Sequence, residues 1–327
     1  MKKKLLALAI VGALPLAGLL TACDMGPRIG ILQPADHVAL DAAREGFKQG
    51  LKENGISKFV VDYRNAKGNS ADLTLLAKDL VDSSQLTLGI GTGAAQALKG
   101  ASENAGNENP ILFTAVTDPV VAGLVSSSAN TTGYVCGTTD ANPVNEQVAL
   151  LKEFKPTATK LGIMYTQTEV NSQVQAQQAA AAAVAVGLSV STETCTGPSD
   201  IGATALALVQ SGVDAIYLPT DNNIASNMNA VKTAVASSGV LVICGEEGML
   251  SGGGHVTLSI DYFELGRTTG AMAAAILKGE KKPTDYPVVP VAASDCEYVY
   301  SSLNLADAGL SMPEALLSAH NWRNVDA

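Results

Sequence analysis

Residues 28–51, RIGILQPADHVALDAAREGFKQGL, combine a short apolar run, a polar turn and a stretch with apolar residues on helical spacing. Residues 160–187, KLGIMYTQTEVNSQVQAQQAAAAAVAVG, repeat this pattern. Gly30 aligns with Gly162 and Gly55 with Gly187 at an offset of 132 residues, and Asp72 with Asp200 and Thr92 with Thr220 at 128. A collinear series of matches predicts two halves of like topology.

The rest of the chain alternates apolar runs with helix-like stretches in the same way, which is typical of βαβ units and parallel sheets. We predict strands at Ile29–Leu32, Phe59–Tyr63, Leu86–Ile90, Ile111–Val116, Leu161–Tyr165, Leu188–Thr192, Ala215–Leu218 and Leu241–Cys244. We predict helices at Ala39–Leu51, Asp72–Val81, Ala94–Leu98, Ser172–Val186, Ile201–Val209 and Ile224–Val235. The fold class is therefore α/β, with two doubly wound lobes whose strand ends face a shared cleft.

The amino terminus predicts export. Three lysines, Lys2 to Lys4, precede an apolar run, Leu5–Leu20, that is shorter than the about 20 residues needed to span a bilayer. Small residues then lead to Cys23, a pattern that resembles the lipobox of bacterial lipoproteins. We predict a signal peptide at residues 1–22 and a lipid on Cys23 that anchors the protein outside the cytoplasm. An ordinary cleaved signal is the alternative.

Charge and cysteine usage exclude several classes of protein. Loss of the three signal lysines takes the net charge from −10 to −13, and the only basic cluster along the sequence is Lys281 with Lys282, which argues against nucleic acid as a partner. The remaining cysteines, Cys136, Cys195, Cys244 and Cys296, form no CxxC motif, so we predict no metal site and no cofactor. Cys244 is expected to be a buried free thiol. The sequence does not decide whether Cys136 and Cys296 form a disulfide.

Polar and glycine-rich clusters follow the predicted strands. Gly91, Thr92 and Gly93 precede a helix start, whose free N–H groups suit a carboxylate, although a plain turn is the alternative. Thr117 and Asp118 follow the next strand, and Asp118 equally suits a turn cap. Asp221 and Glu246 are our candidates for holding an ammonium group.

Further candidates follow the first strand of each half. They are Gln33 and His37 in the first half, and Tyr165 and Asn171 in the second, with Asn171 an alternative helix cap. Tyr63 and Tyr262 are as suited to core packing as to a pocket wall. None of the three histidines neighbours a serine or cysteine in a nucleophile motif, and GxSxG, GxGxxG and GxxxxGK[ST] are absent, so the sequence does not predict an enzyme.

Four segments together resemble one family, the ABC-transporter substrate-binding lipoproteins related to tryptophan- and tyrosine-binding proteins. They are Gly30-Ile-Leu-Gln33 with Ala39-Leu-Asp-Ala-Ala-Arg-Glu-Gly-Phe47, Phe113-Thr-Ala-Val-Thr-Asp-Pro119, Tyr217-Leu-Pro-Thr-Asp-Asn222 and Ile260-Asp-Tyr-Phe-Glu-Leu-Gly-Arg-Thr-Thr-Gly270. The resemblance spans about Arg28 to Leu317. Gly93, Gly248–Leu250 and the four cysteines depart from what the family leads us to expect.

The resemblance implies a periplasmic-binding-protein fold with a three-segment hinge. Residues 28–137 plus 261–283 would form lobe 1, and residues 142–259 plus 284–327 lobe 2, with Asp261 at the cleft. It also implies an amino-acid ligand, aromatic in several relatives.

The leading hypothesis is a monomer that captures a small zwitterion without catalysis and delivers it to an ABC permease in the membrane. Alternatives left open are a sugar, nucleoside or peptide ligand, or a sensor that reports to a membrane receptor. Sugar clefts usually offer several aromatic faces, and aromatic residues are only 4% of this chain.

Overall fold

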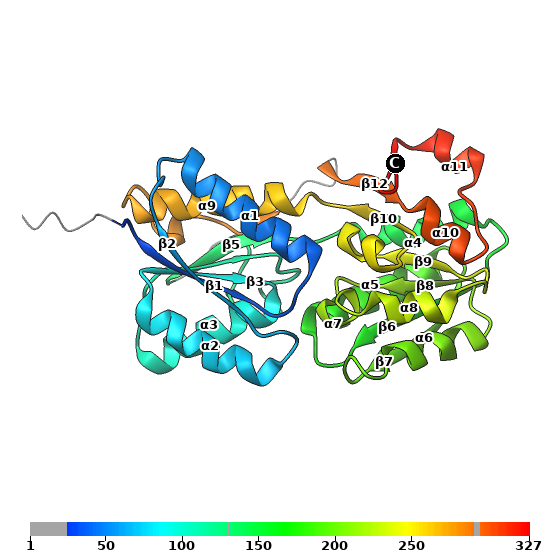
Figure 1. The fold of residues 1–327 in the computed structure, drawn as a ribbon, viewed down its shortest axis with the longest axis horizontal. Helices are drawn as coiled ribbons and strands as arrows, with labels where there is room; N and C mark the ends of the chain where they lie inside the picture. Colours follow the sequence, from blue (N-terminus) through cyan, green and yellow to red (C-terminus); the bar gives the residue numbers. More distant parts are fainter. Residues whose placement is uncertain (1–24, 130, 132, 291–294) are drawn as a thin grey trace, which may run out of the picture.

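The computed structural model describes residues 25–129, 131, 133–290 and 295–327, so the predicted signal peptide and Cys23 lie outside the described residues. Two parallel sheets form two separate lobes (Figure 1). The first sheet has the order β11-β5-β4-β3-β1-β2 and comprises β1 (Arg28–Gln33), β2 (Val60–Asn65), β3 (Leu86–Ile90), β4 (Ile111–Thr114), β5 (Val135–Thr139) and β11 (Val289–Pro290).

The second sheet has the order β13-β12-β10-β9-β8-β6-β7. It comprises β6 (Lys160–Thr166), β7 (Ser189–Cys195), β8 (Ala215–Leu218), β9 (Leu241–Cys244), β10 (Val256–Ser259), β12 (Glu297–Tyr300) and β13 (Trp322–Asn324). In each lobe the first strand pairs in parallel with the second on one side and the third on the other. This shared order confirms the predicted doubly wound halves. Only β12 runs antiparallel to its neighbour β10.

Helices cover both faces of each sheet. In the first lobe, α1 (Val38–Glu53) and α9 (Tyr262–Leu277) pack on one face, and α2 (Ser70–Ser83) and α3 (Thr92–Ala105) on the other (Figure 1). In the second lobe, α4 (Val144–Phe154) and α5 (Val170–Ala185) cover one face, and α6 (Ile201–Gln210) and α8 (Met228–Val235) the other. The short elements are α7 (Asn222–Ala225), η1 (Glu247–Gly252), η2 (Pro283–Asp285), α10 (Ser302–Asp307) and α11 (Glu314–Ala319).

Two of the predicted elements need correction here, and several other elements were not predicted. The helix predicted at Ile224–Val235 is two helices, α7 and α8, with a break at Ser226 and Asn227. The strand predicted to reach Val116 ends at Thr114, because Ala115 adopts a left-handed φ of 55° that no strand residue has. Helices α4 and α9 and the strands β5, β10, β11, β12 and β13 lie outside the repeated pattern and were not predicted.

The chain crosses between the lobes after β5, after β10 and after β11. Val289 and Pro290 pair in parallel with Thr138 and Thr139 of the first sheet. The assignment of residues 284–327 to the second lobe is therefore wrong for β11, and the last crossing comes after Pro290 rather than at Pro283. A two-residue strand carries no periodic signal from which to predict it.

The four cysteines within the described residues are free thiols, so the structure contains no Cys136–Cys296 disulfide. Cys244 is fully buried, as predicted, and burial raises the pKa of its thiol. None of the helices in the described part of the chain is long and apolar enough to cross a membrane.

Four glycines allow α1 and α9 to touch along their backbones. A Cβ atom built on Gly266 would lie 1.9 Å from the carbonyl oxygen of Ala43, and one on Gly46 would lie 2.0 Å from that of Phe263. Gly50 and Gly270 show the same close approach one turn further along. This contact fixes α9, which follows the second crossing, against α1 of the first lobe.

We therefore expect Gly266→Ala to lower the free energy of unfolding by about 1–3 kcal/mol, because the added methyl group forces the two helices apart. Gly100→Ala is the matched control. Gly100 lies within α3, and a Cβ atom there would have nothing within 4 Å, so alanine raises helix propensity and stability by up to about 1 kcal/mol. Urea denaturation measures both, and equal stability of the two variants would contradict the close contact.

Candidate ligand-binding cleft

The carboxyl ends of the two parallel sheets face each other across a cleft that is closed by direct contacts. Thr117 Oγ1, after β4, lies 3.3 Å from Thr220 Oγ1, after β8. Ser226 Oγ, after α7, donates to the carbonyl oxygen of Asp36 at 2.8 Å. Each contact joins one lobe to the other, so the lobes touch at two places.

A cavity of about 110 Å³ remains inside this closed cleft. Its walls include the first residues of three long helices, namely Asn69 and Ser70 of α2, Thr92 and Gly93 of α3, and Glu169 to Asn171 of α5. Helix amino termini carry unpaired N–H groups and a partial positive charge. None of the described residues that line the cavity is lysine, arginine or an aromatic residue.

The loop Gly91–Gly93 forms part of this wall. Gly91 has φ 85°, a left-handed conformation that favours glycine, and it precedes α3 without any side-chain cap. The helix begins at Thr92 rather than at Ala94, so Thr92 and Gly93 belong to its first turn. Both residues line the cavity. An uncapped helix terminus at a cavity wall is suited to an anionic group.

Glu169 is the one carboxylate in the cavity wall, and it binds across to the loop after β8. Its two oxygens accept hydrogen bonds from the backbone N–H groups of Asn222 and Asn223 at 3.0 Å and from both side-chain amides at 2.7 and 3.0 Å. Burial, followed by the nearby charge of Asp221, raises the pKa of Glu169 to about 8. Asn171 lies beside it and donates to the carbonyl oxygen of Thr220 at 2.5 Å.

Asp221 is fully buried and serves its own lobe. Its carboxylate accepts from the backbone N–H and the hydroxyl of Thr166 at 2.6 and 2.8 Å, and from the N–H of Ile224 at 2.9 Å. It therefore caps α7 and ties the end of β6 to the loop after β8. Asp221 is not among the residues that line the cavity, and its role in holding an ammonium group stays a prediction.

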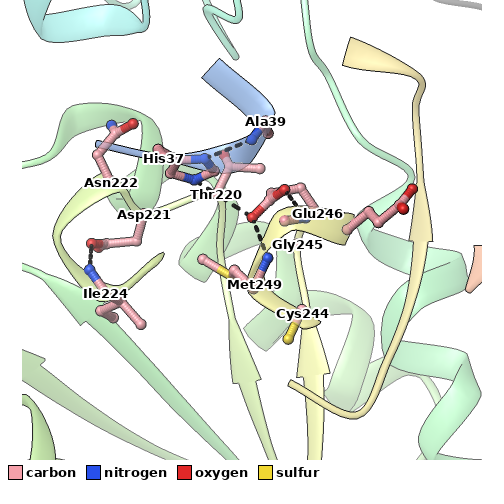
Figure 2. A network of polar contacts seen from close by, with 12 residues as sticks. His37, Ala39, Thr220, Asp221, Asn222, Ile224, Cys244, Gly245, Glu246 and Met249 are labelled. Atoms are coloured by element: carbon pink, nitrogen blue, oxygen red, sulfur yellow. Dashed lines mark hydrogen bonds and ion pairs between the residues drawn. The ribbon is translucent and has the colours of Figure 1, made fainter. Parts of the chain in front are cut away.

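Glu246 and His37 face each other where α1 of the first lobe meets η1 of the second (Figure 2). Glu246 caps η1 by accepting from the N–H groups of Gly248 and Met249. His37 caps α1 by accepting from the N–H of Ala39 at its Nδ1, which leaves Nε2 as the protonated nitrogen, 3.5 Å from Glu246 Oε1. Burial lowers the pKa of His37 to about 4 and raises that of Glu246 to about 8.

A further polar cluster includes Asp140, at the first crossing between the lobes, and Gln175, neither of which was predicted. Asp140, buried after β5, accepts from Thr117 Oγ1 at 3.0 Å and from the hydroxyl of Tyr262 at 2.9 Å. Gln175 Oε1 accepts from the N–H and the hydroxyl of Thr220 at 2.7 and 2.9 Å. Among the described residues, Gln175 Nε2 has no hydrogen-bond partner although the side chain is fully buried.

Two signals in the sequence point to these residues. Asp140 directly follows β5 at the end of Gly137-Thr-Thr-Asp140, much as Asp118 follows β4 in Val116-Thr-Asp118. Gln175 lies four residues after Asn171, on the same face of α5.

The remaining predicted site residues have local roles. Asp118 accepts from the N–H groups of Val120 and Val121, which confirms the alternative of a turn cap. Gln33 bridges Arg44 and Asp41 of α1. Tyr165 packs against the core of the second lobe, and Asp261 is exposed and caps α9. The described residues contain no cluster of three or more metal-ligating side chains.

The model of the ABC transporter substrate binding protein family matches residues 28–321. The chain belongs to this family. It is 33% identical to the tyrosine-binding protein of Clostridioides difficile (strain R20291) over 307 residues, which cover 88% of this chain and 87% of that protein. The family and the fold are those of solute-binding proteins rather than enzymes.

Two solved structures with nearly equal sequence identity differ in how well they superpose. A Streptococcus pneumoniae domain in complex with L-Trp is 32% identical and has a TM-score of 0.84, covering 91% of this chain and 99% of its own. A Clostridium difficile substrate-binding protein in its ligand-free, open form is 33% identical but has a TM-score of 0.68, covering 92% and 99%. The lobes of this substrate-binding protein are therefore arranged more as in the complex than as in the open form.

The shifted carboxylate at the lobe interface makes stability depend on pH. The pKa of Glu246 is raised from 4.5 to about 8 in the folded protein. Between pH 6.5 and 8 the folded protein therefore still holds a proton on this side chain, whereas the unfolded chain has already lost it at lower pH. The free energy of unfolding then falls as pH rises through this window, by up to about 1.4 kcal/mol per pH unit for one proton. The lowered pKa of His37 acts only below pH 6.5, with the opposite sign.

We expect Glu246→Gln to reduce this slope without abolishing it, because the pKa of Glu169 is raised in the same direction. Urea denaturation at pH 6.5 and pH 8 measures the slope. Glu108→Gln, at an exposed position, is the control and should retain the slope of the wild type. An unchanged slope in Glu246→Gln would show that this carboxylate is not buried against His37.

Proposed function

We propose that this substrate-binding protein captures an amino acid as a zwitterion between its lobes and delivers it to an ABC permease. The observation that carries the proposal is the convergence of α2, α3 and α5 on a cavity between the lobes that contains no cationic side chain among its lining residues. Such a wall balances a ligand carboxylate through backbone N–H groups and helix dipoles. An ammonium group on the same ligand is suited to Glu169, which is half-buried in the same wall and whose raised pKa a neighbouring cation would lower.

The size and composition of the cavity support a small polar solute. Its volume of about 110 Å³ is below the roughly 300–1,000 Å³ of pockets for drug-sized ligands, which argues against a peptide. The lining residues offer no aromatic face on which a sugar ring stacks. Structures with bound myo-inositol or D-allose are only 16% and 17% identical to this chain, and they share the fold alone.

The named ligands of the relatives are L-Trp and tyrosine, which supports an amino acid and adds aromatic side chains to those worth testing. We expect one or a few amino acids to stabilise the protein strongly in a thermal-shift screen of all twenty. A ligand at 1,000 times its Kd adds about 4 kcal/mol to the free energy of unfolding. Sugars and nucleosides in the same screen form the comparison, and stabilisation by these alone would contradict the proposal.

A charge placed at the start of α3 then tests where the ligand carboxylate lies. A Cβ atom on Gly93 would make only an ordinary contact, 3.4 Å from Leu73 Cδ1, so the fold tolerates a side chain there. We expect Gly93→Asp to weaken binding of the amino acid about tenfold or more, because two carboxylates then share one helix terminus. Gly93→Asn has nearly the same shape without the charge and should bind clearly more tightly than Gly93→Asp. Equal affinities in titration calorimetry would rule out a carboxylate at α3.

We also propose that the mature protein begins at Cys23 and is held outside the cytoplasm by a lipid on that residue. The support is the basic, apolar and small-residue order of residues 2–22 together with membership in a transporter family. Mass spectrometry of the mature amino terminus should find a diacylglyceryl group on Cys23. An unmodified Cys23, or a terminus elsewhere, would refute the anchor.

A further inference from the structure

A groove of about 800 Å³ runs along the outer edge of the first lobe, remote from the cleft. One wall is a face of α1 that presents Arg44, Lys48 and Lys52 at intervals of four residues. The other wall is the segment 57–63, which includes Lys58 and most of β2, the edge strand of its sheet. Four cationic side chains thus line one groove, although they are spread over fifteen residues of sequence.

The charges of this groove are only partly neutralised. Arg44 pairs with Asp41 at 2.7 Å, and it shares Glu45 with Lys48 at 3.2 and 2.7 Å. Lys52 and Lys58 are exposed, and neither has a carboxylate within 4.0 Å in the described part of the chain. The lining residues therefore carry a net charge of about +3 on a chain whose total is −10.

Apolar and aromatic side chains lie between these cations. Met25 is 62% exposed and Tyr63 is 38% exposed, and Phe59 and Val61 line the floor of the groove. Arg44 lies 4.5 Å from the centre of the Tyr63 ring. Lysine and arginine interleaved with aromatic and apolar side chains are typical of surfaces that rest in the headgroup region of a bilayer.

The groove also lies where the described chain starts. Met25 is one of its lining residues, and the carbonyl oxygen of Pro27 accepts from the N–H of Val60 at 3.0 Å, which ties this segment to β2. Cys23 lies two positions before Met25 in the sequence, and an extended chain spans at most about 3.6 Å per residue. A lipid on Cys23 would enter the membrane within about 7 Å of Met25.

We propose that this basic groove, lined by Met25, Arg44, Lys48, Lys52, Lys58 and Tyr63, is a membrane-contact surface that binds anionic phospholipid headgroups. It holds the first lobe flat on the bilayer, so the lipid and the groove together fix the orientation of the protein. The two acyl chains of a diacylglyceryl group on Cys23 hold the protein on the membrane, and the basic surface beside them adds attraction to anionic headgroups that orients the first lobe. Nucleic acid is disfavoured as an occupant, because the remainder of the surface carries net negative charge.

The test uses the unacylated mature chain, residues 23–327 with Cys23→Ser, so that binding reports the surface and not the lipid. We expect it to cosediment with vesicles of 70% phosphatidylcholine and 30% phosphatidylglycerol in 50 mM NaCl, and to be released by 500 mM NaCl. Lys52→Glu combined with Lys58→Glu should lower the partition coefficient about thirtyfold or more, since each basic residue near an anionic surface contributes about a factor of five.

The matched control is Lys281→Glu with Lys282→Glu, the exposed basic pair that is contiguous in the sequence. It changes the net charge equally and should bind vesicles as the wild type does. Equal losses in both double variants would show that only net charge matters, and absence of binding to the anionic vesicles would also overturn the proposal. Unchanged unfolding midpoints establish that both variants fold, and the outcome is independent of which solute the cleft binds.

Discussion

Parallel strands impose one constraint from which the cleft of this protein follows. Each helix that follows a parallel strand starts at the carboxyl edge of the sheet, so its unpaired N–H groups gather at that edge. Here two such edges face each other, and the starts of α2, α3 and α5 surround one cavity. The positive character of the site therefore comes from backbone, and the cavity needs no arginine or lysine. A chain of net charge −10 can in this way offer a local environment for an anion.

The acidic residues around the cleft mostly organise its walls. Asp221, Glu246 and Asp118 each accept backbone N–H groups at the start of a helix or turn, and Glu169 accepts four donors from the loop after β8. Asp221 and Glu246 are buried, and buried carboxylates are costly unless hydrogen-bonded. The hydrogen bonds of Glu169, Asp221 and Glu246 hold the segments after β6, β8 and β9 in place. The contact between His37 and Glu246 differs because it joins the two lobes.

The fold could be predicted from the sequence where the two halves repeat one pattern, and a continuous apolar run such as Leu241–Cys244 matches its strand residue for residue. Helix α9 was missed because Gly266 and Gly270 interrupt the apolar positions Leu265, Met272 and Ile276 on its buried face. The site was predictable in position, since Gly91–Gly93 follows a strand, but the direction in which Asp221 points depends on Thr166, 55 residues away. Gln175 and the basic groove were missed because only folding brings their neighbours together.

Helix α1 connects the two functional surfaces. Its first residues meet η1 of the second lobe through His37 and Glu246, while Lys48 and Lys52 near its other end line the basic groove. At 1.5 Å per residue, the distance from His37 to Lys52 is about 22 Å along the helix. Because α1 is also fixed to α9 by backbone contact, it behaves as a rigid part of the first lobe. If the groove rests on the membrane, closure moves the second lobe relative to a first lobe whose orientation is fixed.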